Sequence, residues 1–125
     1  MDRLGDLLEK DVIDIQKNLH LGHIDDVLYD PATEKMCGIL VITGDLSPNL
    51  RMVPSGEITS YERNHVSIRD KSSLHNHDES GNYKNFQRDM VGRLYMTTRG
   101  NPLGILKDIV YDFENNILLG VEISE

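Results

Sequence analysis

The sequence predicts an all-β fold: a small β-barrel followed by a second, incomplete copy of the same unit. The first observation behind this prediction is an internal repeat, because residues 21–41 align without gaps with residues 103–123 at an offset of 82. The second is that apolar residues occur in short alternating runs bounded by turn residues, which is typical of strands. The third is composition, since a chain with no Trp and two Phe must build its core from aliphatic side chains.

The repeat is anchored by residues that are identical in both copies. A repeat indicates that one supersecondary unit was used twice, so the second copy tests any interpretation of the first. The anchors are Gly22 and Gly104, Asp26 and Asp108, Tyr29 and Tyr111, Asp30 and Asp112, and Gly38 and Gly120.

The strands of the first unit follow from alternation and from turn residues. A short strand is expected at 11–15. Residues 22–29 and 36–42 then form an antiparallel hairpin, because Asp30-Pro31 between them favours a turn. Gly38 lies mid-strand, where glycine weakens pairing and marks a bulge or bend, as Gly120 does in the second copy. The remaining strands expected in this unit are 51–54, 57–59 and 65–68.

The second copy indicates which face of each strand is buried. Leu40 corresponds to Glu122, and glutamate is rarely buried without a partner. Because side chains alternate across a strand, the odd positions of each copy are expected to face the core, with Cys37 as a small core residue. The same comparison favours inward positions for Ile24 and Leu28.

Three segments are predicted along the chain: a barrel at 1–72, a polar linker at 73–90 and a partial second barrel at 91–125. A half-barrel exposes unpaired strand edges and buries too little apolar surface to be stable alone. It must therefore pack on the first barrel, pair with the same fragment of a second chain, or belong to a longer parent protein. We expect a homodimer formed through the second half-barrel.

The order of these motifs resembles a known family. The motifs are Val12-Ile13-Asp14, residues 21–31, Gly38-Ile39-Leu40-Val41, Val53-Pro54-x-x-x-Ile58 and Val66-x-Ile68. Over residues 5–70 this order resembles the PRC-barrel domain, which is shared by the H subunit of photosynthetic reaction centres and the C-terminal part of the RimM ribosome-maturation factor. The beginning is most similar to the short single-barrel proteins of spore-forming bacteria (the YlmC/YmxH type). Residues 91–123 resemble only the first half of another such domain.

The resemblance implies a non-catalytic protein-interaction or scaffold module with an unknown protein partner and no cofactor. Such domains serve as adaptors in ribosome assembly, RNA processing or photosynthetic complexes. The alternative is a docking element on a membrane-bound electron-transfer complex, similar to the reaction-centre H subunit. A metal-dependent protein or enzyme is the third hypothesis.

Charge and hydropathy indicate which classes of partner and which cellular location to expect. The net charge is −8, and no cluster of Lys and Arg is present to neutralise phosphates, so direct nucleic-acid binding is not expected. No apolar run approaches the ~20 residues of a membrane span, so no membrane insertion is expected. The N-terminus shows no signal region, which predicts a cytoplasmic location. The single cysteine, Cys37, excludes an internal disulfide.

Two groups of side chains are candidates for chemistry. His75, His77 and Asp78, followed by Glu79, are the only cluster of potential metal ligands, but without a further ligand to close the site a solvated loop is expected instead. The four repeated aspartates could form carboxylate pairs, yet their positions around hairpin turns favour a capping role. The two repeated tyrosines are expected to pack their rings and keep their hydroxyls in water. We predict no catalytic residue.

Overall fold

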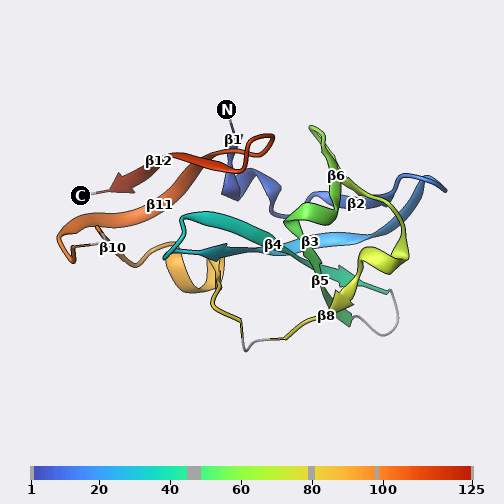
Figure 1. Ribbon diagram of the computed structural model, residues 1–125, viewed down its shortest axis with the longest axis horizontal. Helices are drawn as coiled ribbons and strands as arrows, with labels where there is room; N and C mark the ends of the chain where they lie inside the picture. The colour runs from blue at the N-terminus through green and yellow to red at the C-terminus, as the bar shows by residue number, and fades with distance from the viewer. Residues whose placement is uncertain (1, 45–48, 79–80, 98, 125) are drawn as a thin grey trace.

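The computed structural model describes residues 2–44, 49–78, 81–97 and 99–124. Strands dominate it (Figure 1), which confirms the predicted all-β, barrel-like fold. The larger sheet contains β2 (Asp11–Asp14), β3 (Leu19–Asp30), β4 (Lys35–Thr43), β5 (Asn49–Pro54), β6 (Ile58–Tyr61), β7 (His65–Ile68), β8 (His75–Asn76) and β9 (Lys84–Asn85). The smaller sheet contains β1 (Asp2–Arg3), β10 (Leu94–Met96), β11 (Pro102–Asp112) and β12 (Ile117–Ser124).

The helical segments are single turns between strands. They are the 3₁₀ turns η1 (Leu4–Leu7), η2 (Ser55–Glu57) and η3 (Lys71–Ser73), and the π-helical turn η4 (Phe86–Met90). In the described part of the chain, none of these turns has the length and apolar character that crossing a membrane requires.

The larger sheet is a curled, mostly antiparallel arrangement in the order β6-β7-β2-β3-β4-β5-β8, with β9 added to β3. Strand β7 joins β2 in parallel, and all other pairs in this sheet are antiparallel. The core side of the sheet carries aliphatic residues from every major strand, among them Val12, Val53 and Val66, which are fully buried.

The two copies of the repeat form matching hairpins, β3–β4 and β11–β12. Ile24 pairs with Val41 in the first hairpin as Leu106 pairs with Ile123 in the second. Each hairpin contains two bulges at the same positions, one just after this pair and one just before the glycine of the return strand. The predicted irregularity near Gly38 and Gly120 is therefore present.

These bulges explain why the predicted inward faces are partly wrong. A bulge adds one residue to one strand, so the alternation of side chains changes phase beyond it. Ile24 faces the core as predicted. After the bulge, Val27 and Tyr29 face the core, and Leu28 is buried outside the main core cluster.

The bulge on the return strand has the same effect on the odd positions. Cys37 is the bulged residue of β4 and is only half-buried, and its counterpart Leu119 is exposed. Leu40, expected on the outer face because Glu122 matches it, lies outside the core cluster, but it is fully buried there. Ile39 and Val41 do face the core, as predicted.

Each copy of the repeat begins with an arm that lies on the hairpin of the other copy. We call residues 2–9 the first arm and residues 84–92 the second arm. Asp2 of β1 pairs with Tyr111 of β11, and Lys84 of β9 pairs with Tyr29 of β3. These two pairings are equivalent under the same offset of 82, so the exchange is reciprocal. In Figure 1 the first arm lies beside β11.

The repeated aspartates Asp26 and Asp108 fasten the exchanged arms. The backbone N–H of Gly5 donates to Asp108 at 3.0 Å, and the N–H of Gln87 donates to Asp26 at 2.8 Å. Arg88 adds a second backbone N–H to Asp26 at 3.1 Å. A carboxylate that accepts backbone N–H groups makes a charge-assisted bond, stronger than one between neutral groups.

The second arm corrects the expectation of a polar linker at 73–90. Phe86 and Met90 are buried in the core cluster, in the places that Leu4 and Leu7 occupy for the first arm. The last part of that segment, from Lys84 onward, therefore belongs to the folded core. Its composition is polar, but its few apolar side chains are the ones that enter the core.

One hydrophobic cluster joins the two copies, so the second half-barrel packs on the first. Tyr29 and Tyr111 meet edge to face at 6.5 Å, and Tyr61 stacks on Phe113 at 4.6 Å. Both repeated tyrosines are fully buried, against the expectation of hydroxyls in water. The Tyr111 hydroxyl accepts the N–H of Met36 at 2.9 Å. Burial of the Tyr29 side chain raises the pKa of its hydroxyl.

The fastening role of Asp26 can be tested by its replacement. Asp26→Ala leaves the backbone N–H groups of Gln87, Arg88 and Val27 without their charged acceptor, so we expect the free energy of unfolding to fall by about 2–3 kcal/mol. Urea denaturation measures this change. The control is Asp25→Ala at the exposed neighbouring position, which should change it by less than about 0.5 kcal/mol. Equal unfolding midpoints for the two variants would contradict the role.

Candidate protein-interaction groove

The predicted metal candidates do not form a ligand set in the structure. His75 donates from Nε2 to Oε2 of Glu57 at 2.8 Å. The ring of His77 lies 6.4 Å from that of Tyr83, and the Asp78 carbonyl accepts the Tyr83 hydroxyl. Glu79 lies outside the described residues. Within the described ranges, no three His, Cys, Asp or Glu residues are grouped so that they could hold a metal ion.

Of the four repeated aspartates, Asp30 and Asp112 act on backbone groups of the turns, whereas Asp26 and Asp108 bind the arms and do not cap turns. Asp30 accepts the N–H of Ala32 at 2.9 Å, and Asp112 accepts that of Asn115 at 3.1 Å. The side-chain and backbone hydrogen bonds from Asn115 lower the pKa of Asp112. These are the contacts of turn-capping residues.

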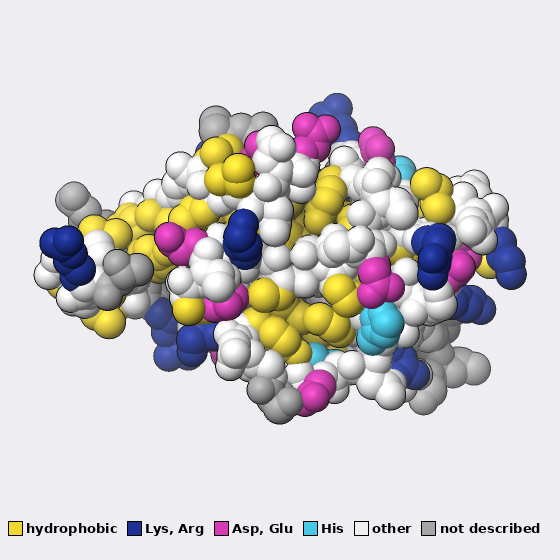
Figure 2. Space-filling model, in the orientation of Figure 1, with side chains coloured by type: hydrophobic (Ala, Val, Ile, Leu, Met, Phe, Trp, Pro, Cys, Tyr) yellow, Lys and Arg dark blue, Asp and Glu magenta, His cyan; other side chains and the backbone are white. Residues whose placement is uncertain are grey.

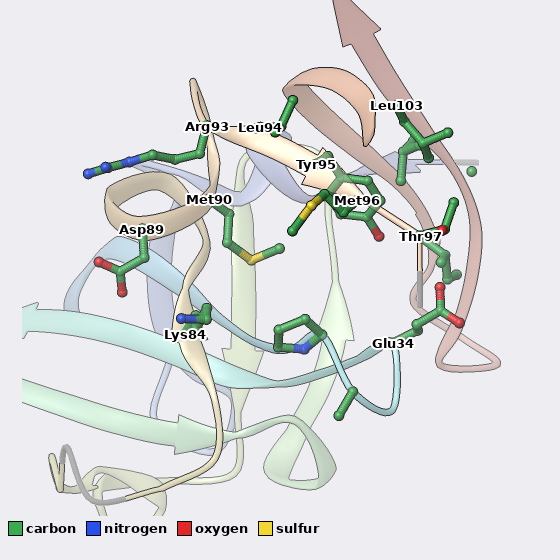
Figure 3. Close-up of a pocket in the computed structure, with 15 residues that line it drawn as sticks. Glu34, Lys84, Asp89, Met90, Arg93, Leu94, Tyr95, Met96, Thr97 and Leu103 are labelled. Atoms are coloured by element: carbon green, nitrogen blue, oxygen red, sulfur yellow. The ribbon is translucent and has the colours of Figure 1, made fainter. Parts of the chain in front are cut away.

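A concave surface lies between β10, β12, the second arm and the turn that joins β3 to β4. We call this surface the half-barrel groove; it has a volume of about 930 Å³. Figure 3 shows Met90, Tyr95 and Met96 together in the middle of the view, with Lys84, Asp89 and Arg93 to one side and Glu34 to the other. Other apolar residues that line it are Leu94, Leu103, Leu118 and Val121.

The groove exists because the inward positions of the second copy are less covered than those of the first. Met36 and Ile39 are buried in the first copy, whereas their counterparts Leu118 and Val121 are half-buried. The first copy is covered by β5 and β7, through fully buried residues such as Val53. In the part of the chain that the structure describes, no strand covers β10–β12 in the same way.

Two strand edges border the groove. In the first copy the outer edge of β4 pairs with β5, and that of β2 pairs with β7. The matching edges of β12 and β10 have no strand partner among the described residues. An unpaired edge presents backbone N–H and C=O groups that can bind another strand.

Exposed apolar side chains surround these edges. On β10, Leu94 and Met96 are 55% and 53% exposed, and on β12 Ile117 and Leu119 are each 51% exposed. In Figure 2, hydrophobic side chains appear at the surface in the part of the molecule where β10–β12 lie in Figure 1. A concentration of apolar side chains at a surface is typical of an interaction site.

The one charged side chain of β12 is paired within the chain. Glu122 accepts from Arg3 of the first arm through both carboxylate oxygens, at 2.8 Å from Nε and 2.9 Å from Nη2. The hydrogen bond and the charge of Arg3 lower the pKa of Glu122. The edge of β12 therefore carries a compensated charge, which weakens the protection that a free carboxylate gives to an edge strand.

No known family model and no curated protein matches this chain. The function is therefore argued from the half-barrel groove and its edges. Sequence reasoning predicted the unpaired edges but did not single out Leu94, Tyr95 or Met96. These three residues form an apolar run that corresponds to the opening strand β2 of the first copy. The offset between the two strands is one residue larger than the offset of 82 between the hairpins, so the ungapped alignment does not match them.

The absence of a metal-ligand set among the described residues leads to a test with zinc. We expect equimolar Zn²⁺ to leave the thermal midpoint of unfolding unchanged, because a ligand stabilises a protein only when it binds the folded state. Differential scanning fluorimetry with and without Zn²⁺ measures this. His75→Ala, which removes one candidate ligand, should behave in the same way. A rise in the midpoint that is present in the parent chain and lost in this variant would restore the metal hypothesis.

Proposed function

We propose that this chain is a non-catalytic PRC-barrel protein that acts as a protein-interaction or scaffold module and self-associates through the half-barrel groove. The observation that carries the proposal is the pair of unpaired edges, on β10 and β12, on either side of an apolar groove. Proteins commonly bind one another by adding a strand to such an edge, with the backbone providing affinity and side-chain pockets providing specificity.

The comparison between the two copies supports this proposal. In the first copy, additional strands complete the sheet and bury its inward face, so the equivalent surface of the second copy is one that a strand of this kind fits. A second chain is a suitable source, because most homo-oligomers are closed by a two-fold axis that brings the same surface of both chains together. The partner strand would bury the exposed apolar residues of β10–β12.

The proposal predicts a dimer whose affinity rises with salt. Each chain carries a net charge of −8, so the two chains repel each other at low ionic strength and salt screens this repulsion. Sedimentation equilibrium at tens of micromolar should give the mass of two chains. The dissociation constant should decrease as the NaCl concentration is raised from about 0.05 M to about 0.5 M.

Two outcomes would contradict this prediction. The mass of a single chain over the whole range of concentration and salt would remove self-association. A dimer that weakens as salt increases would indicate that ion pairs between the chains, rather than the apolar groove, hold the dimer together.

A further inference from the structure

The two mid-strand glycines of the repeat have different surroundings. Gly38 is a position where only glycine fits, because a Cβ atom there would collide with the carbonyl oxygen of Val53 on the neighbouring strand β5. It also has an ordinary backbone conformation, so the reason for glycine is close approach and not a left-handed φ. In the first copy this glycine lets the backbone of the neighbouring strand β5 approach β4 closely.

Gly120 is the equivalent residue on β12, and no such neighbour exists. No heavy atom of the described residues, apart from its chain neighbours, lies within 4 Å of a Cβ atom placed there. Its φ is not in the left-handed region either. Glycine in a strand interior weakens the strand by comparison with a residue that has a side chain. Among the described residues, no close neighbour and no left-handed φ therefore requires glycine at this position.

We propose that Gly120 is the point where an antiparallel strand, added to the edge of β12, approaches closely, and that this strand is β12 of a second copy of the chain. The inference rests on the proposed function and names the contact through which the chains associate. In the first copy, β5 lies antiparallel to β4, with Pro54 opposite Gly38. The strand added to β12 takes the equivalent place, with its backbone close to Gly120.

The direction of the added strand agrees with two-fold symmetry. When two identical edge strands meet around a two-fold axis perpendicular to the sheet, they necessarily run antiparallel, as β5 runs to β4. The same axis keeps the equivalent faces of both sheets on one side. The smaller sheets of the two chains then join into one continuous sheet, with a half-barrel groove in each chain.

The side chains of β12 favour this self-pairing. Ile117 and Leu119, each half exposed, lie on the same strand as Gly120, so two antiparallel copies bring their apolar residues together. The only charged side chain of the strand, Glu122, is held by Arg3 of its own chain, which limits like-charge repulsion across the junction.

The experiment is the substitution Gly120→Val. The open space at this position accepts the side chain, and valine favours strand structure, so the isolated chain should fold as before. In the dimer, the new side chain collides with the closely approaching backbone of the added strand. We expect the dissociation constant from sedimentation equilibrium to rise at least ten-fold, with an unchanged thermal midpoint measured on dilute, monomeric protein.

Gly56→Val is the matched control. Gly56 also has open space around its Cβ position and an ordinary φ, but it lies in η2, away from β12. It receives the same side chain and should dimerise like the parent protein. A Gly120→Val chain that dimerises as tightly as this control would overturn the inference and leave the proposed self-association intact.

Amide hydrogen exchange of the unmodified protein provides a second measurement that needs no variant. Exchange in β12 should slow as the protein concentration rises through the dissociation constant, because the edge N–H groups become bonded or covered. A dimer that forms with no change in β12 would place the interface elsewhere and overturn the inference. A chain that stays monomeric at every concentration would instead remove the proposed self-association, and this inference with it.

Discussion

The structure depends on the reciprocal exchange of arms between the two copies of the repeat. Asp26 and Asp108 each accept backbone N–H groups from the arm of the other copy, and the apolar residues of both arms enter one core. A sheet of three main strands buries too little apolar surface to be stable alone. The exchange compensates for this small buried area, because the apolar side chains of the smaller sheet pack in the same core as those of the larger sheet.

The hairpins were predictable because their signals are local. Alternating apolar residues, the Asp30-Pro31 turn and the ungapped repeat all act within a short stretch of chain. The glycines marked an irregularity in the return strands but not which residue is the extra one, so the phase of the strands was not predictable. Cys37 shows the consequence, since alternation placed it in the core, whereas as the bulged residue of β4 it is only half-buried.

The arms escaped prediction for a different reason. The first arm turns through a 3₁₀ helix and the second through a π helix one residue longer, so an ungapped comparison does not align them. What they share is physical: Glu9 and Gly92 both have positive φ, and their N–H groups donate to Ile24 and Leu106 at 2.9 Å in both copies. Counting the strands of the repeat predicted that edges of the second copy are unpaired, but the lining of the groove depends on the unpredicted arm.

Arm exchange also changes what the connection between the repeats contributes. The segment around residue 80 ties together two pieces that already hold each other at two separate places, one for each arm. Its main contribution is a high effective concentration of one piece near the other. A chain divided there would consist of two fragments, each carrying the arm that the other needs, which is the arrangement required for complementation between separately made halves.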